Sequence, residues 1–324
     1  MAVFTAVTPA QVSTLLGQLG LGPLVDLQGI SAGIENTNYF VSTPQGEWVL
    51  TLFERLQPEQ LPYYLGLMKH LADKGLPVPA PHPGSDGALW FWLAGKPAAL
   101  VNKLPGAHQL APDLHHCAQM GALMARMHLA VADFAPDQPN LRGLHWQQQM
   151  VPRLLPLLDD AQQTLVRDEL DFQQHLMASA AYAELPRGAV HCDLFRDNLL
   201  FDGLPAHEVL TGCFDFYFAG QDAFAYDLAV CLNDWCLAGE SGALDDSRTG
   251  AMVGAYQQVR PLTGNEQRLM PGLLRAGAFR FWLSRLADLH LPRDAELLAP
   301  KNPEHFEHVL RHRIANPWHP LQST

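Results

Sequence analysis

The first hundred residues show short apolar runs separated by turn residues, a pattern typical of β-strands. The runs cover residues 24–30, 39–43, 48–53, 89–93 and 98–101. Pro44-Gln45-Gly46 separates the second run from the third, and Asp86-Gly87 forms a turn before the fourth. We therefore expect a five-stranded antiparallel sheet in this part of the chain.

Two helices are predicted beside this sheet. Thr8-Pro9 has the form of a helix start, and leucines follow at helical spacing as far as Gly20. A second helical pattern runs over residues 58–74 and stops at Gly75.

After Asn102 the strand pattern ends and helical patterns dominate. They cover residues 112–130, 146–158, 161–182, 273–289 and 300–314, and a further helix opens at residue 225. A chain of 324 residues exceeds the usual single core. We predict an α+β protein with a β-rich lobe over residues 1–102, a helical lobe over 103–314, and a tail over 315–324 with few apolar anchors.

Composition limits the function classes. The net charge is −12 and only 17% of residues are charged, which argues against a nucleic-acid partner. The N-terminus lacks a basic segment followed by an apolar run, and no apolar stretch approaches the roughly 18 residues of a membrane span, so we expect a cytoplasmic protein without membrane contact. The five cysteines occur in apolar segments without a Cys-x-x-Cys motif, which predicts reduced core thiols.

One polar loop interrupts the helical half of the chain. His191, Asp193 and Asn198 precede two short apolar runs that meet at Asp202-Gly203, and Asp215 follows the second run. Two such runs around a turn predict a β-hairpin, which would fold Asp215 back towards Asn198.

This set of side chains suits phosphoryl transfer. Asp193 would accept the proton of an attacking hydroxyl, while the Asn198 amide oxygen and the Asp215 carboxylate would hold Mg²⁺, which prefers oxygen ligands. Asp and Asn in a loop also make ordinary turns. The loop with Asp193 and Asn198 is followed, in the right order, by a hairpin and then Asp215. This order favours a phosphoryl-transfer site over ordinary turns.

A polar loop between the first two strands is the candidate phosphate-binding segment. Its backbone N–H groups and small polar side chains would face a nucleotide. The candidates are Ser31, Gly33, Asn36, Thr37 and Asn38. With so few glycines an ordinary hairpin loop is the alternative. Backbone at Val101 and Lys103, where the sheet ends, would bind adenine.

The spacing His191-x-Asp193-x-x-x-x-Asn198, followed by Asp215-Phe216, resembles the catalytic loop of the protein kinase-like superfamily. Further stretches narrow the resemblance, almost end to end, to bacterial homoserine kinases of the aminoglycoside phosphotransferase-like type, with choline and methylthioribose kinases more distant. These stretches are residues 33–41, 49–54, 75–79, 232–236 and 280–286.

The resemblance implies the two-lobed protein kinase-like fold, a small antiparallel sheet followed by a mainly helical lobe. It also implies ATP and Mg²⁺ as cofactors, and transfer of the γ-phosphate to the hydroxyl of L-homoserine in threonine biosynthesis. His191 and Arg196 join Asp193 as candidate catalytic residues, and Asp227 would brace the loop. The alternatives are a kinase of choline, methylthioribose or an aminoglycoside, or a catalytically silent nucleotide-binding protein.

A substrate that is an amino acid brings an ammonium and a carboxylate. On that basis Asp234, with Trp235 beside it, would pair with the ammonium, and Arg280 or Arg285 would bind the carboxylate bidentately. The two arginines are five residues apart, or about 140° around a helix, so we expect only one to serve a single anion. An ion-paired surface face is the alternative.

Two positions depart from the wider kinase pattern. Thr51 stands where most kinases carry the phosphate-binding lysine, and Phe195 stands where a cation or His is common. Arg196 would compensate from the next position, or would form an ion pair with Asp197.

Overall fold

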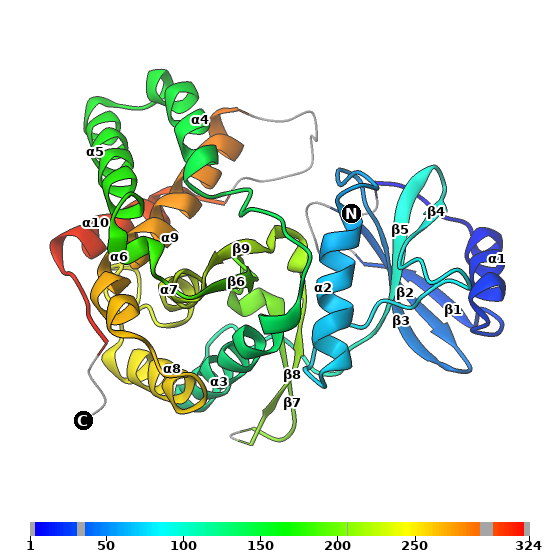
Figure 1. Ribbon diagram of the computed structural model, residues 1–324. Helices are drawn as coiled ribbons and strands as arrows, with labels where there is room; N and C mark the ends of the chain where they lie inside the picture. Colours follow the sequence, from blue (N-terminus) through cyan, green and yellow to red (C-terminus); the bar gives the residue numbers. More distant parts are fainter. Residues whose placement is uncertain (1–3, 31–35, 206, 292–300, 321–324) are drawn as a thin grey trace. The chain divides into compact units, whose positions relative to one another are not determined.

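The computed structural model describes residues 4–30, 36–205, 207–291 and 301–320. The chain divides into two compact units. The first comprises Met1–Gly106 and Thr211–Phe214, and the second comprises Ala107–Leu210 and Asp215–Thr324 (Figure 1). The domain boundary expected after residue 102 stays a prediction.

The first unit is built on one antiparallel sheet, as the strand pattern predicted. Its strands are β1 (Asp26–Gly29), β2 (Thr37–Thr43), β3 (Gly46–Leu52), β4 (Phe91–Leu93) and β5 (Lys96–Asn102), in the order β1-β2-β3-β5-β4. The register places Asn38 of β2 opposite Thr51 of β3. Side chains at such facing positions contact each other.

Two helices cover this sheet on opposite faces, α1 (Pro9–Leu19) and α2 (Leu61–Asp73) (Figure 1). The α1 helix begins as predicted, because Thr8 accepts a hydrogen bond from the Gln11 N–H in a capping box. It ends at Gly20, whose φ of 71° favours glycine. The α1 side chains that pack against the sheet are Val12, Leu15 and Leu16.

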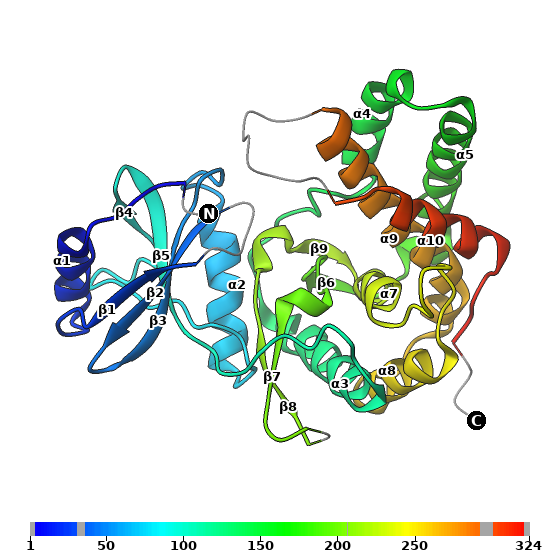
Figure 2. The same cartoon turned by 180° about the vertical axis from the view of Figure 1, so that it is seen from behind.

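The second unit is mainly helical. Its longer helices are α3 (Leu114–Ala130), α4 (Leu144–Leu154), α5 (Asp160–Met177), α7 (Phe224–Trp235), α8 (Asp246–Val259), α9 (Gly264–His290) and α10 (Glu304–Ala315), with a single turn at α6 (Ala180–Ala183). The long helix α9 packs against α4, α5, α7 and α10 and forms the centre of the unit (Figure 2).

Helix α8 and the first turns of α9 were not predicted from the sequence. Gly250 and Gly254 weaken the helical propensity of α8, and its buried positions form only a short stripe. The α9 helix begins at Gly264 behind a Thr263 capping box and continues through Pro271. Tertiary packing therefore sustains helices where local propensity is weak.

Helix α8 crosses α3 at very close range. A Cβ atom added at Gly121 of α3 would overlap with the carbonyl oxygen of Met252 of α8. The two backbones approach this closely because glycine has no side chain.

Two small strand pairs frame the polar loop of the second unit. Strand β6 (Arg187–Val190) pairs with β9 (Gly220–Ala223), and β7 (Leu199–Asp202) pairs with β8 (Val209–Cys213). The second pair is the predicted hairpin. The loop that carries His191, Asp193 and Asn198 therefore connects β6 to β7.

The five cysteines are all buried and free, which confirms the prediction of reduced core thiols. Among the described residues, no helix is both long and apolar enough to cross a membrane.

Candidate active site

The loop from His191 to Asn198 has an unusual backbone at its start. Cys192 has a φ of 64° and Asp215, after the hairpin, a φ of 66°. Non-glycine residues rarely adopt this left-handed conformation, and it persists where the surrounding structure holds it in place.

Asp227 on α7 holds the backbone at Cys192 in this conformation, as expected. Its Oδ1 accepts the Cys192 N–H at 2.8 Å and its Oδ2 accepts the His191 N–H at 3.2 Å. Burial alone would raise the pKa of Asp227, but the hydrogen bonds from the His128 side chain and the Cys192 backbone N–H keep the pKa below its usual value. The carboxylate is therefore ionised, and it fixes the loop through two charge-assisted hydrogen bonds.

His128 on α3 continues this buried network, a role that was not predicted from the sequence. Burial lowers the pKa of His128, so the ring is neutral. Its Nε2 lies 3.1 Å from Asp227 Oδ2 and its Nδ1 lies 2.8 Å from the Tyr256 hydroxyl. A neutral ring satisfies both contacts when Nε2–H donates to the carboxylate and Nδ1 accepts from Tyr256. In the sequence, His128 was hidden within the apolar stripe of its helix.

Asp193 is the candidate base. Burial raises its pKa to about 6, against the influence of Arg280, whose charge and hydrogen bond lower it. Arg280 Nη1 lies 3.3 Å from Asp193 Oδ1. At neutral pH the carboxylate is thus largely ionised, yet more basic than an exposed aspartate, as a general base requires.

Asn198 is tied to the same loop. Its Nδ2 donates to the Asp193 carbonyl oxygen at 2.7 Å, so its Oδ1 is the atom left to act as a ligand. Strand β7 starts directly after Asn198, and Asp215 follows β8 by two residues. Because the strands of a short hairpin run antiparallel, both residues lie at the same end of it.

The oxygens of Asn198 and Asp215 suit Mg²⁺. No cluster of three or more His, Cys, Asp or Glu side chains that could hold a metal occurs in the described ranges. Mg²⁺ needs no such cluster, because it is usually bound by one or two protein oxygens together with substrate phosphates. The pair therefore fits an ion that arrives with a nucleotide.

His191 packs in the core under the catalytic loop and hydrogen bonds to its backbone. Its side chain is buried against the Phe216 ring, with ring centroids 4.5 Å apart. Its Nδ1 accepts the Asp193 N–H at 3.3 Å. The predicted catalytic residue His191 is thus placed to orient Asp193.

Arg196 does not form the ion pair with Asp197 that the sequence left open, and its catalytic role stays a prediction. Its Nε and Nη2 each lie 3.1 Å from an oxygen of Asp234, and its backbone N–H donates to Asp234 at 2.9 Å. Asp197 pairs instead with Lys301, at 3.4 Å. Both Asp234 oxygens are therefore engaged by Arg196, which weighs against the expectation that Asp234 binds an ammonium group.

Trp235 lies in the core and does not line either of the two hollows described below. Its side chain is fully buried, and its indole N–H donates to the Leu194 carbonyl oxygen at 3.1 Å. The expectation that Trp235 contacts a substrate is therefore replaced by a structural role, that of holding the loop on α7.

Arg285 lies one and a half turns beyond Arg280 on α9 and borders a hollow of about 370 Å³. We call this hollow the acceptor hollow. The loop residues Phe195, Arg196 and Asp197 line it, together with Leu110, Asp234, Lys301 and His305. Lys301 and His305 were not identified from the sequence, because only the fold brings them to the loop.

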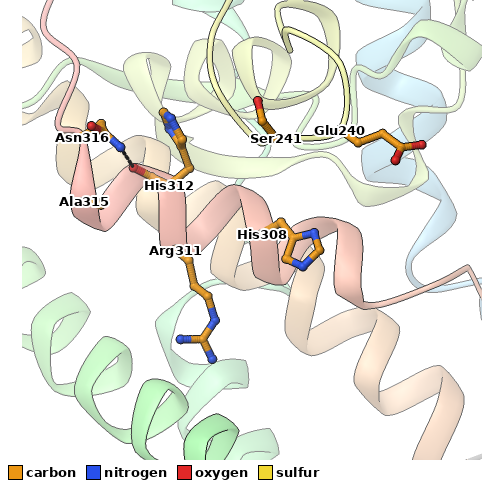
Figure 3. A pocket seen from close by; sticks show the side chains of 7 residues that line it. All are labelled: Glu240, Ser241, His308, Arg311, His312, Ala315 and Asn316. Atoms are coloured by element: carbon orange, nitrogen blue, oxygen red, sulfur yellow. Dashed lines mark hydrogen bonds between the residues drawn. The ribbon is translucent and has the colours of Figure 1, made fainter.

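A second hollow, of about 560 Å³, lies along α10 (Figure 3). It is lined by Glu240, Ser241 and α10 residues, which include His308 and Arg311. No residue of the 191–198 loop reaches it, so we do not place the site there.

In the first unit, two of the candidate nucleotide residues have structural partners. Thr37 is fully buried, and its hydroxyl donates to Glu54 at 2.8 Å. Asn38 accepts a hydrogen bond of 2.8 Å from the Thr51 hydroxyl and reaches back towards the Asn36 carbonyl oxygen. Thr51, at the position of the missing lysine, thus fixes Asn38. The predictions for Ser31 and Gly33 lie outside the described residues.

Some of the backbone groups expected to bind adenine have partners within the first unit. The Lys103 N–H already donates to the Glu47 carbonyl oxygen at 2.9 Å, so in this structure it is not available to adenine. Val101 is paired with Val49 inside the sheet. Adenine binding through the other backbone groups of Val101 and Lys103 stays a prediction.

Comparison with known proteins shows the family of this chain. Residues 26–262 match the model of the phosphotransferase enzyme family, and the chain belongs to that family. It is 56% identical over 318 residues to a homoserine kinase of Polaromonas naphthalenivorans, covering 98% of this chain and 99% of the relative. A homoserine kinase of Paraburkholderia phymatum is 55% identical, with 97% and 99% covered.

Solved structures show the same fold at low identity. Amicoumacin kinase hAmiN in complex with AMP-PNP, Ca²⁺ and Ami superposes with a TM-score of 0.66 at 16% identity, covering 93% of this chain and 91% of that one. A spectinomycin phosphotransferase in complex with ADP gives 0.64 at 12% identity, with 93% of each chain covered. The predicted α+β, kinase-like fold is confirmed.

Proposed function

We propose that this protein transfers the γ-phosphate of ATP to the side-chain hydroxyl of L-homoserine, giving O-phospho-L-homoserine. The catalytic part of this proposal is supported by one arrangement, an ionised, partly buried Asp193 held beside Asn198 on a braced loop. The choice of homoserine is supported by the 56% identity to a homoserine kinase over nearly the whole of both chains.

Asp193 acts as the general base. Its carboxylate accepts the proton of the attacking hydroxyl as the oxygen bonds to phosphorus, and the leaving group is ADP. Asp227 and His191 keep the carboxylate in position, since both hydrogen bond to the loop backbone around it. Asn198 and Asp215 would hold Mg²⁺, which when bound neutralises the charge of the transferring phosphate.

The positive charge beside Asp193 comes from a residue far away in the sequence. Phe195 offers no cation, and Thr51 is hydrogen-bonded to Asn38. Arg280 of α9 is the cation that contacts Asp193. It keeps the base ionised and brings positive charge to the reacting groups, a form of electrostatic stabilisation.

A coupled assay of ADP release tests the proposal. The purified chain is given ATP, Mg²⁺ and, in separate reactions, L-homoserine, choline, methylthioribose or kanamycin. We expect turnover with homoserine at a kcat/KM at least about a hundredfold above the others, a discrimination that polar recognition can supply. Preference for another alcohol would replace homoserine as the substrate, and no turnover at all would indicate a catalytically silent protein.

A further inference from the structure

The acceptor hollow carries an excess of positive charge beside the catalytic loop. We infer that Arg285 binds the α-carboxylate of the acceptor amino acid in this hollow, and so makes the enzyme select amino acids over amino alcohols. This inference rests on the proposed function and assigns a residue to its substrate specificity.

The hollow has the size and place for a small acceptor. Its volume of about 370 Å³ exceeds that of an amino acid with four carbons, and Phe195, Arg196 and Asp197 of the catalytic loop line it. These three residues lie between Asp193 and Asn198 in sequence. A ligand seated there is therefore next to the loop that carries the base.

The carboxylates of the hollow are already paired. Asp234 is held by Arg196 through both oxygens, and Asp197 lies 3.4 Å from Lys301. Arg285 forms no ion pair with a carboxylate in the part of the chain that the structure describes. Three cations against two carboxylates leave one positive charge in excess, in a chain whose net charge is −12.

His305 does not add to this charge. Burial lowers its pKa, and the neighbouring Arg285 lowers it further. The ring is therefore neutral near pH 7. The excess charge of the hollow resides on Arg285, which faces two neutralised carboxylates.

Arg285 is held ready for an anion. Its Nη1 donates to the Asn302 carbonyl oxygen at 2.9 Å, and its guanidinium lies 4.5 Å from the centroid of the Phe306 ring. Burial lowers the pKa of Arg285, while Asp234 and Asp197 raise it. A guanidinium that has lost part of its water but has no carboxylate partner gains strongly from a carboxylate, which it can bind with two parallel N–H groups.

Arg280 is the less suitable of the two arginines. It is 2% exposed, contacts Asp193 and does not line the hollow. The two side chains point about 140° apart around α9. Arg280 therefore contacts the base, while Arg285 is placed to bind the acceptor.

The experiment compares two acceptors in three variants. L-Homoserine and 3-aminopropan-1-ol share the hydroxyl, the carbon chain and the amine, but only homoserine has the carboxylate. For Arg285→Gln we expect the homoserine KM to rise roughly 10- to 100-fold, as for the loss of a charged hydrogen bond, with the KM for ATP unchanged. Activity with 3-aminopropan-1-ol should be low in the wild type and unchanged in the variant.

Two further variants distinguish the loss of carboxylate binding from a general disturbance of the structure. Arg285→Lys keeps the charge without the two-pronged geometry and should give an intermediate KM. Arg311→Gln is the matched control, because Arg311 lies on α10, pairs with Glu307 and does not line the hollow. It should leave both KM values as in the wild type.

Equal losses with both acceptors, or a homoserine KM unchanged in Arg285→Gln, would overturn the inference while leaving homoserine as the substrate. Equal kcat/KM for homoserine and 3-aminopropan-1-ol in the wild-type chain would also overturn the inference alone. No turnover of homoserine would overturn the proposed function, and the inference with it.

Discussion

Arg280 Nη1 lies 3.3 Å from Oδ1 of Asp193, although 87 residues separate the two in sequence. Burial raises the pKa of the Asp193 carboxyl and the Arg280 guanidinium lowers it, and the resulting pKa is about 6. The rate at mildly acidic pH therefore depends on this contact.

The first prediction concerns the pH profile of Arg280 variants. In the wild type, kcat/KM should fall tenfold per pH unit below about pH 6, where Asp193 becomes protonated. Loss of the cation in Arg280→Gln raises the Asp193 pKa, so the acid limb moves to higher pH and the rate at pH 6 falls by about tenfold or more. Arg280→Lys should restore part of the shift. Identical acid limbs in wild type and Arg280→Gln would contradict the assigned role.

The second prediction removes the base itself. Asp193→Asn keeps the shape but cannot accept a proton, so kcat should fall by about 10²- to 10⁴-fold. Nucleotide affinity, measured by fluorescence or calorimetry, should be nearly unchanged because Asp193 is not proposed to bind ATP. Full activity in this variant would exclude Asp193 as the base.

The third prediction concerns Mg²⁺. Asp215→Asn removes the charge but tolerates the left-handed backbone that Asp215 adopts, with its φ of 66°. The Mg²⁺ concentration for half-maximal activity should rise by about tenfold or more, because one anionic ligand is lost. Titration of activity against Mg²⁺ at fixed ATP measures this. An unchanged midpoint would mean that other oxygens hold the ion.

The fourth prediction tests the close crossing of α3 and α8. Gly121→Ala places a Cβ against the Met252 carbonyl oxygen, and the resulting overpacking should lower the free energy of unfolding by about 1–3 kcal/mol.

Gly250→Ala is the matched control for this crossing. It lies on α8 with no atom within 4 Å of the added Cβ, and should be neutral or stabilising by up to about 1 kcal/mol. Denaturant unfolding of both variants measures the difference, and equal stabilities would argue against the close approach.

Much of the fold was predictable from the sequence. The five strands, the α1 helix with its Thr8 cap and Gly20 stop, and the hairpin after Asn198 are all encoded within a few residues. Helix α8 was not, because its glycines weaken the local signal and packing against α3 compensates.

The sequence by itself determined the order of the strands along the chain, the loop with Asp193 and Asn198, and the cysteines as core thiols, because each depends on spacing or composition over a short stretch. Only the tertiary structure decided the partners of the charged side chains. Arg196 binds Asp234, Arg280 meets Asp193, and Arg285 borders the acceptor hollow. Helical spacing predicts that Arg280 and Arg285 lie on different faces of α9. The residues that each face contacts depend on packing between elements far apart in sequence, and no local sequence pattern predicts that packing.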